Sequence, residues 1–432
     1  MAKLLDQPRY LCATAGMNTV QAITHALPIL HAGPGCAAKL GGGMGGSGYI
    51  SSQVFPCTNI SEKEVVFGGT DRLHETIENA LRVIKSDLVV VLSSCISEII
   101  GDDVEEVVRS FQDAGRPVIY ASTPGFKNNN YIGHEWVIQA LIEQYLKPSP
   151  KKQKGLVNIW AGVPRQDLFW YGDLRELERL LTEIGLTPNT IFGYGRGIRN
   201  IDRIPEAEFN LVVSPWVGVN NAIQLQEKFG TPYLHVPTLP IGAYETSKFL
   251  RTVAGFAGIG SEVVEPVIAG HEKEFYYFIE RFADIFFELR VMPRRFVTVS
   301  DAYYALAVTK FLTNDFGLFP DKQYITDDTP EELQNAVAEY FRDLNHGIEA
   351  EAVFSTDGYE IDEQLRQTDF HGVPLILGAS WETEIAKELN AHYLNISWPM
   401  VERLVMNSTY AGYGGGLKLL EDLYSVVLKR FF

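Results

Sequence analysis

The chain has 432 residues, of which 46% are hydrophobic and 12% aromatic, so it can bury several cores and is too long for one compact domain. Its formal net charge of −17, with no run of Lys and Arg, argues against nucleic acid and anionic membrane surfaces as partners. No stretch reaches the roughly 18 consecutive apolar residues of a membrane-spanning helix, and four cysteines are too few for a disulfide framework.

The N-terminal stretch MAKLLDQPRYLCATAG has neither the basic and apolar regions nor the small-residue cleavage site of a secretory signal. We therefore expect a cytoplasmic protein. In that reducing compartment each cysteine is expected to be a buried thiol, a nucleophile or a metal ligand.

Short apolar runs ending at glycine, serine or proline recur along the chain, and each is followed by an amphipathic stretch of helical length. The runs are SDLVVVLSSC (86–95), RPVIYASTPG (116–125), LVNIWAGVP (156–164), FNLVVSPWVG (209–218), RRFVTVSD (294–301) and VPLILGASW (373–381). Fully apolar strands alternating with helices are typical of parallel sheets covered on both faces. The pattern therefore predicts an α/β protein.

Two changes in composition divide this pattern into three parts. The first is the lysine- and proline-rich run LKPSPKKQKG at 146–155, and the second is the crossing into VMPRRFVTV after an aromatic stretch at 274–290. We predict three doubly wound Rossmann-like domains with parallel sheets, at 1–153, 154–292 and 293–432. The aromatic stretch EFYYFIERFADIFFELR is expected to be a helix of the core rather than part of a cofactor site.

Three cysteines lie at the edges of predicted elements and beside small residues, in YLCATAG (Cys12), GPGCAAK (Cys36) and SSCISE (Cys95). Glycine and alanine let a bulky group approach the backbone, whose amide N–H groups can neutralise the sulfides of an iron–sulfur cluster. Being far apart in sequence, these cysteines could converge only through the fold. From spacing alone they are either small buried hydrophobic residues or ligands, and no C-x-x-C pair indicates a self-contained zinc or ferredoxin-type site.

Other candidate features are less specific. His31 is a ligand, a proton donor or a structural histidine, and the structural role is the more common one. The glycine-rich run at 41–48 lacks the G-K-[ST] ending of a phosphate-binding P-loop, and GYGRG at 193–197 is more often a turn than a dinucleotide site. The chain has no G-x-S-x-G elbow of a hydrolase.

Several blocks, in the same order, resemble the β-chain branch of the nitrogenase component 1 superfamily. In the first part they are YLCATAGMNTVQAITHALPILHAGPGCAAKL, SEKEVVFGGTDRLHETI and SSCISEIIGDDVEEVV. Later, VPTLPIGAYETSKFLRTVAGFAG, DAYYALAVTKFL and ISWPMVERLVMNSTYAGYGGGLKLLEDLYSVVLKR are similar to the family's middle, third-domain and C-terminal segments. The resemblance covers most of the chain and implies the nitrogenase component 1 fold.

The resemblance further implies that Cys12, Cys36 and Cys95 are thiolate ligands to the iron of a P-cluster-type [8Fe-7S] centre, shared with three cysteines of a homologous α subunit. Cys57 falls where some β chains have a cysteine that is not a ligand. The implied assembly is an α2β2 heterotetramer that receives electrons from an ATP-dependent [4Fe-4S] reductase, the iron protein. The chain would then be a subunit of an oxidoreductase. The glycines beside its cysteines would let a large anionic cluster come close to the backbone.

The chain departs from the family pattern at two places. Some β chains have a serine after Thr-Pro that can add a ligand to the oxidised cluster, whereas STPGFKNNN has Gly125 there, which argues against such a change of ligand. No cysteine follows Cys95, and none of the later histidines has the surroundings of an α-chain cofactor ligand: His235, His271, His346, His371 and His392. The active-site iron–sulfur cofactor and the substrate are therefore expected in the α subunit, with no catalytic residue in this chain.

The glycine-rich segment GGGMGGSGYISSQVFP favours a nitrogenase-like reductase over a true dinitrogenase. Specifically, the chain resembles the methylthio-alkane reductases, which cleave the carbon–sulfur bond of small organic sulfides and release methanethiol and a hydrocarbon. The alternatives are a dinitrogenase β chain that reduces N2 to ammonia, a cofactor-assembly scaffold, and a tetrapyrrole reductase subunit whose three cysteines bind a [4Fe-4S] cluster. Retention of all three cysteines disfavours the scaffold, and the Phe-Gly-Gly block and the C-terminus disfavour the tetrapyrrole branch.

Overall fold

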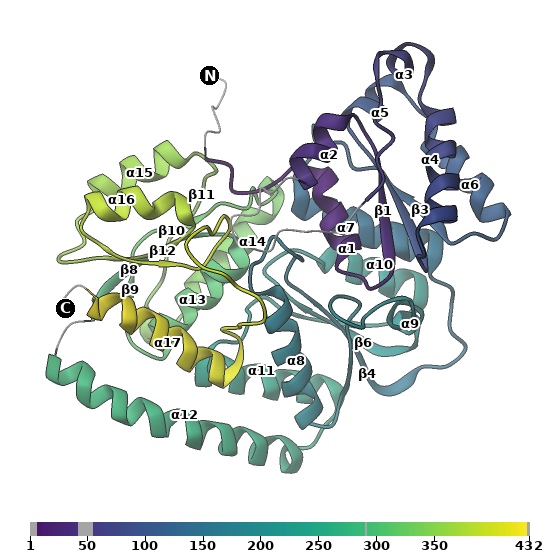
Figure 1. Cartoon of the computed structure of the whole chain (residues 1–432). Helices are drawn as coiled ribbons and strands as arrows, with labels where there is room; N and C mark the ends of the chain where they lie inside the picture. Colours follow the sequence, from purple (N-terminus) through teal and green to yellow (C-terminus); the bar gives the residue numbers. More distant parts are fainter. Residues whose placement is uncertain (1–6, 42–54, 290–291, 430–432) are drawn as a thin grey trace.

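Three parallel β-sheets form the framework of the computed structural model, which describes residues 7–41, 55–289 and 292–429 (Figure 1). Every strand pairing between named strands is parallel. The predicted α/β class with parallel sheets is therefore confirmed. Among the described residues, no helix is long and apolar enough to cross a membrane.

The first sheet has the order β1-β2-β3, and helices cover both of its faces. Its strands are β1 (Ala26–His31), β2 (Leu88–Ser93) and β3 (Val118–Ala121). One face packs on α4 (Thr70–Val83) and α6 (Val104–Asp113), and the other on α1 (Met17–Gln21) and α7 (Asn130–Ala140).

The alternation of side chains along β2 explains why its sequence is apolar throughout. Val89 and Val91 belong to the cluster formed with α4 and α6, whereas Val90 and Leu92 belong to the cluster formed with α1 and α7. Successive residues of a strand point to opposite faces, so a strand covered on both faces must be apolar at every position.

The second sheet has the order β5-β4-β6-β7, so the chain reverses direction across the sheet at β4, as a doubly wound fold requires. Its strands are β4 (Gln153–Ala161), β5 (Thr187–Asn189), β6 (Ala207–Val213) and β7 (Tyr233–Val236). Its helices include α8 (Trp170–Glu183), α10 (Val219–Phe229) and α11 (Gly242–Ala257).

The third sheet has the order β11-β10-β8-β12-β13, with β9 (Phe319–Pro320) beside β8 (Arg295–Ser300). Its remaining strands are β10 (Gln323–Ile325), β11 (Ala352–Phe354), β12 (Leu375–Gly378) and β13 (His392–Asn395). The helices are α13 (Ala302–Asn314), α14 (Glu331–Arg342), α15 (Gly358–Gln367), α16 (Thr383–Glu388) and α17 (Gly412–Leu428).

The predicted domain limits stay a prediction. The three sheets follow one another along the chain in the predicted order, and β4 begins at the first limit, at Gln153. A single hydrophobic cluster nevertheless runs from Met17 in the first part to Val427 in the last, so the three parts share one continuous core.

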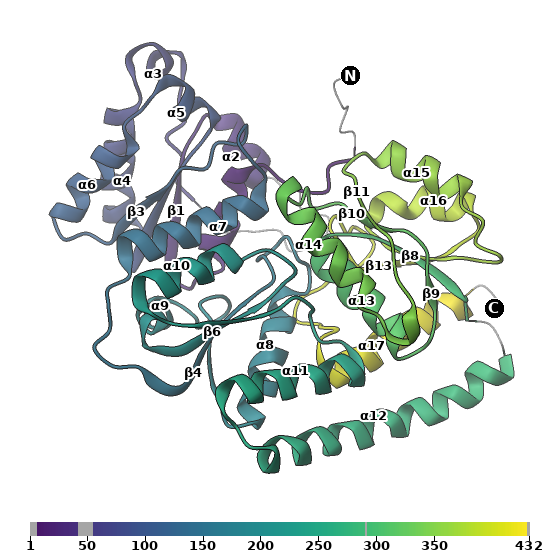
Figure 2. The same ribbon diagram turned by 180° about the vertical axis from the view of Figure 1, so that it is seen from behind.

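Residues 274–289 of the aromatic stretch belong to a single long helix, α12 (Ser261–Leu289), that lies along one side of the molecule (Figure 2). Phe275 is buried, but Tyr276, Tyr277 and Phe278 are each about half exposed, at 47%, 50% and 47%. The expectation of a core helix is thus correct for one face only, because α12 packs on α11 and α17 and leaves its opposite face uncovered.

Candidate functional site

The three predicted ligand cysteines lie at the carboxyl ends of the strands of the first sheet. Cys36 is in α2 (Pro34–Gly41), which follows β1, and Cys95 is the first residue of α5 (Cys95–Ile100), which follows β2. Cys12 immediately precedes the short 3-10 helix η1 (Ala13–Gly16). In parallel sheets the loops at these ends form the ligand-binding edge, so the fold brings the cysteines to the expected place.

Gly125, in the loop after β3, marks the point where two of the thiols meet. A Cβ atom added at Gly125 would lie 2.9 Å from Cys12 Cβ, 3.6 Å from Cys12 Sγ and 3.4 Å from Cys95 Sγ. Cys36 is close enough to both for their charges to act on it: burial, and then Cys12 and Cys95, raise the pKa of the Cys36 thiol. The structure therefore brings Cys12 and Cys95 together beside a position that only glycine fills without displacement, with Cys36 near enough for both to act on it.

The backbone around Cys12 is fixed by α7. Cys12 pairs with Asn129 in an isolated antiparallel bridge, and the side-chain Oδ1 of Asn130 accepts a hydrogen bond from the amide of Leu11 at 2.8 Å. Asn129 also caps the helix, because its Oδ1 accepts from the amide of Tyr131 at 3.0 Å. The segment that carries Cys12 is thus held against the end of a buried helix although it lies at the surface.

The backbone around Cys95 is fixed by serines and a threonine. Ser94 Oγ donates to the carbonyl of His31 at 2.7 Å, which joins the end of β2 to the end of β1. Ser93 Oγ accepts from the amide of Thr123 at 2.9 Å, which joins β2 to the loop after β3. These bonds tie together the three loops that carry Cys36, Cys95 and Gly125.

His31 is a structural histidine. It is fully buried, with Nε2 2.9 Å from Asp102 Oδ2 and Nδ1 3.2 Å from Thr58 Oγ1. Burial lowers the pKa of the imidazole, and Asp102 opposes that shift. Because both ring nitrogens have partners, the ring holds the end of β1 to neighbouring loops, and Asp102 in turn accepts from the amide of Gly69 at 2.7 Å.

Cys57 is near enough to Cys36 to act on its pKa, but its thiol has partners of its own. It donates to the carbonyl of Ala32 at 3.3 Å and accepts from the amide of Asn59 at 3.4 Å. The segment that carries it runs beside β1 through a bridge between Leu30 and Cys57. These contacts agree with leaving Cys57 out of the predicted ligand set.

The donor set and its exposure fit a shared iron–sulfur cluster. All four cysteines are free thiols, Cys12 is exposed, and Cys36 and Cys95 are partly exposed, so the three sulfurs form a site that opens to the protein surface. No group of three or more His, Cys, Asp or Glu side chains among the described residues could hold a single metal ion. The thiolates of a multi-iron cluster bind different iron atoms, so such a cluster does not require its ligands to converge on one ion.

Of the two glycine-rich features of the sequence, the structure describes one and leaves out most of the other. The glycine-rich run at 41–48 lies almost entirely outside the described residues, since the structure leaves out 42–54. GYGRG at 193–197 lies in the loop after β5 and is far in sequence from the cysteines. It is a turn, as expected, with Gly193 and Gly195 at φ of +107° and +74°.

Sequence reasoning missed a group of buried carboxylates between the second and third sheets: Asp167, Asp173, Asp301 and Asp327. Burial raises the pKa of Asp173 to about 7 and that of Asp327 to about 6, and it raises the pKa of the other two as well. Asp301 directly follows β8, in FVTVSD, and Asp327 lies two residues after β10, in YITDD, which is the one sequence signal that could have found them.

Comparison with known proteins relates this architecture to one family over almost the whole chain. The family model described as nitrogenase component 1 type oxidoreductase matches residues 12–428. A nitrogenase molybdenum-iron protein beta chain of Methanococcus maripaludis is 23% identical over 98% of this chain and 95% of its own length. One subunit of the light-independent protochlorophyllide reductase of Staurastrum punctulatum is 23% identical over 83% of this chain and 71% of its own.

A solved structure has the same fold. The structure described as nitrogenase Cp1 at pH 6.5 superimposes with a TM-score of 0.83 at 18% identity, covering 100% of this chain and 95% of that chain.

Proposed function

The chain belongs to the family of nitrogenase component 1 type oxidoreductases, and we propose that it is the β subunit of a nitrogenase-like reductase complex. In this proposal Cys12, Cys36 and Cys95 hold an electron-relay iron–sulfur cluster of the [8Fe-7S] P-cluster type. The observation that supports it is that Cys12 and Cys95 meet beside Gly125, at the strand ends of the first sheet, with Cys36 near enough for both to raise its pKa.

The cysteines would act as thiolates, although burial and the charges of Cys12 and Cys95 raise the pKa of Cys36 in the metal-free protein. Bound iron holds cysteine deprotonated, because a metal ligand must carry the charge. The cluster would supply reversible one-electron transfer. The hydrogen bonds through Ser93 and Ser94 keep the liganding loops in place, so little rearrangement is needed when the charge of the site changes.

A homologous α subunit is the proposed partner, in an α2β2 heterotetramer. Three thiols that open to the surface are half of the ligand set of a cluster with six thiolates, and Cys12 is exposed in the chain alone. The α subunit would supply the remaining cysteines and carry the active-site cofactor, because no cysteine follows Cys95 in this chain.

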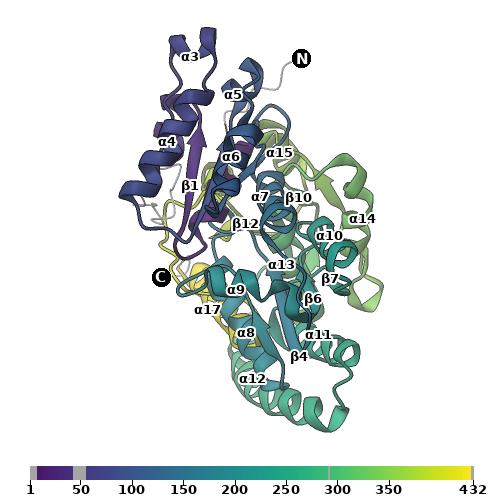
Figure 3. The same ribbon diagram turned by 90° about the vertical axis from the view of Figure 1, so that its right-hand side faces the viewer.

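An ATP-dependent [4Fe-4S] reductase is the proposed electron donor, and an apolar surface suits its docking. Phe67 and Val66 of α3 (Glu62–Phe67) are 82% and 71% exposed, and Ile99 of the neighbouring α5 is 73% exposed. Figure 3 shows α3 and α5 at the outer end of the first sheet. Since α5 begins at Cys95, a donor bound there would lie close to the relay, as electron transfer requires.

For the substrate we propose the methylthio-alkanes, whose carbon–sulfur bond is cleaved with two electrons and two protons to give methanethiol and a hydrocarbon. This assignment rests on the glycine-rich segment of the sequence. The relatives described above are named for nitrogenase and protochlorophyllide reduction, so dinitrogen and tetrapyrroles are the competing substrates. The free thiols are consistent with the reducing cytoplasm that we also propose.

The test is the iron and sulfide content of the anaerobically co-purified complex, with redox-dependent EPR, for Cys36→Ala, Cys95→Ala and the matched control Cys57→Ala. We expect about eight irons per αβ pair in the relay. Either ligand substitution should abolish the cluster and weaken α–β association, because liganding free energy is also assembly free energy. Cys57→Ala should retain both.

Other results of this test would refute the ligand assignment or indicate a competing function. Full iron content and activity in Cys36→Ala or Cys95→Ala would refute the ligand assignment. A four-iron signal would indicate the tetrapyrrole branch, and a complex with no cluster bound by this chain would indicate an assembly scaffold. Methanethiol release from organic sulfides, in a complex without molybdenum or vanadium, would support the substrate proposal against dinitrogen.

A further inference from the structure

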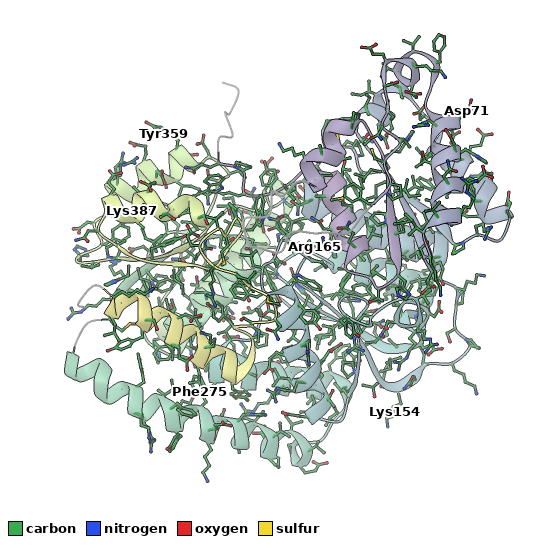
Figure 4. The ribbon with its side chains drawn as sticks, viewed as in Figure 1. Asp71, Lys154, Arg165, Phe275, Tyr359 and Lys387 are labelled. Carbon is green, nitrogen blue, oxygen red and sulfur yellow. The ribbon has the colours of Figure 1, made fainter. Side chains whose placement is uncertain are left out.

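A second candidate site lies away from the cysteines, in a cavity of about 750 Å³ where segments of all three parts of the chain meet. Residues 21–26 of the first part line it, together with Arg165, Trp170 and Tyr171 around the start of α8 and Asn407 near the C-terminus. Figure 4 shows Arg165 near the centre of the molecule, between the first and third parts. The volume is within the range of small-molecule sites, which form preferentially at domain interfaces.

A smaller cavity of about 420 Å³ adjoins the first one, since Tyr171 and Tyr194 line both. Tyr194 is the second residue of GYGRG and is 93% exposed. The two cavities are therefore neighbours that share these tyrosines in their linings. We call this pair of cavities the GYGRG site.

The loop that presents Tyr194 is rigidly built. The amide of Gly193 donates to the carbonyl of Ala22 at 2.8 Å, and the amide of Thr24 donates to the carbonyl of Arg196 at 2.6 Å. Gly193 has a φ of +107°, and a Cβ there would lie 2.8 Å from the Tyr171 ring. The glycine therefore lets the ring of Tyr171 lie against the loop, and the backbone holds Tyr194 out in solvent at a fixed place.

The charge of the GYGRG site is opposite to that of the whole chain. Among the described residues that line it are Arg165, Arg175 and Arg196 against a single carboxylate, Glu178, in a protein whose formal net charge is −17. Glu178 is paired with Arg196 at 2.9 Å. Arg175 lies over the ring of Tyr171, 6.0 Å from its centre. The site thus combines an excess of arginine over carboxylate with aromatic rings.

We propose that the GYGRG site binds a small planar aromatic anion. Guanidinium groups bind carboxylate, sulfonate or phosphate oxygens in a fork geometry, and tyrosine rings offer flat faces for stacking. An exposed aromatic ring on a rigid loop loses little freedom on binding. Within the described part of the chain no cysteine lines either cavity, so this site is independent of the relay cluster and of the function proposed above.

The test compares two fluorescent probes that differ mainly in their charge: 8-anilinonaphthalene-1-sulfonate and neutral N-phenyl-1-naphthylamine. Binding of the anionic probe to the purified full-length chain should saturate at one site that the substitutions below weaken. The affinity for the anionic probe should be about ten-fold or more above that for the neutral probe. Tyr194→Ala and Arg175→Gln should each lower the affinity for the anionic probe about three- to ten-fold, because each removes one exposed contact.

Matched controls are Tyr359→Ala and Arg109→Gln, which remove an exposed tyrosine on α15 and an exposed arginine on α6. Both controls should bind the anionic probe like the unaltered chain. Tyr194 and Arg175 are exposed, so circular dichroism of the two site variants should match that of the unaltered chain. Equal affinity for the two probes, or unchanged binding in both site variants, would overturn the proposal. Iron content of the complex should not change in either variant, which separates this test from that of the cluster.

Discussion

Among single residues, Gly125 has the clearest role. It lies where a side chain would enter the space between Cys12 and Cys95, and the nearest atom to its absent Cβ is Cys12 Cβ, which cannot move without its backbone. The same residue replaces the serine found in some β chains. The structure therefore gives a packing reason for glycine here in addition to the loss of a possible oxygen ligand.

Gly125→Ala should lower the iron content of the complex. The added methyl carbon would be 2.9 Å from Cys12 Cβ, so Cys12 or the loop after β3 must move. Iron per αβ pair and the EPR amplitude of the relay measure the effect. Gly255→Ala, with nothing within 4 Å of its Cβ position, is the control and should keep the full iron content. Equal iron in both variants would show that Gly125 does not limit the site.

Among the elements, the packing of η1 on α7 places the first cysteine. A Cβ on Gly133 of α7 would overlap the carbonyl of Ala13, and a Cβ on Gly16 would lie 2.8 Å from the carbonyl of Gly133. The two glycines let η1 and α7 touch backbone to backbone. This contact is not between strands or along one helix, so the periodicity that reveals elements in the sequence does not reveal it.

Gly133→Ala should destabilise the chain by roughly 1–3 kcal/mol, the usual effect of an added methyl group in a close-packed contact. Urea unfolding measures the change in the free energy of unfolding. Gly270→Ala in α12, which has open space around its Cβ position, should be neutral or slightly stabilising because alanine favours helices. Loss of stability in Gly270→Ala but not in Gly133→Ala would contradict the backbone contact.

Across the whole molecule, the buried carboxylates join the second sheet to the third. Asp173 of α8 accepts from Tyr304 Oη of α13 at 2.9 Å and from Thr409 Oγ1 at 2.6 Å. Burial is the main cause of its raised pKa, and the charges of Asp301 and Glu176 raise it further. These groups fill the interior between the parts of the chain, so their protonation affects how the parts are held together.

The contribution of Asp173 to the free energy of unfolding should fall as pH rises from about 4 to about 7. The pKa of Asp173 is about 7 in the folded chain, whereas an aspartate in an unfolded chain has a pKa of about 4, so over this range the unfolded chain loses a proton that the folded chain keeps. Each proton that the folded chain keeps and the unfolded chain loses lowers the free energy of unfolding by about 1.4 kcal/mol per pH unit. In urea unfolding, Asp173→Asn should gain stability relative to the unaltered chain as pH rises through this range, because the amide can accept the same hydrogen bonds without ionising.

The control for this measurement is Asp71→Asn, an exposed residue of α4, and it should leave the pH dependence unchanged (Figure 4). Parallel pH profiles for the unaltered chain and Asp173→Asn would show that Asp173 does not titrate within the folded interior.

The α/β class and the six strands in the apolar runs can be predicted from local composition, whereas the ligand role of the cysteines stays a prediction from the family resemblance. Strands such as β2 are apolar on both faces, and three cysteines surrounded by small residues can be seen without coordinates. Only the tertiary structure shows which groups meet. These are Cys12, Cys95 and Gly125, the carboxylates between the sheets, and the arginines of the GYGRG site. Several of those contacts join residues far apart in the sequence, and such proximity depends on how whole sheets pack, which no local pattern records.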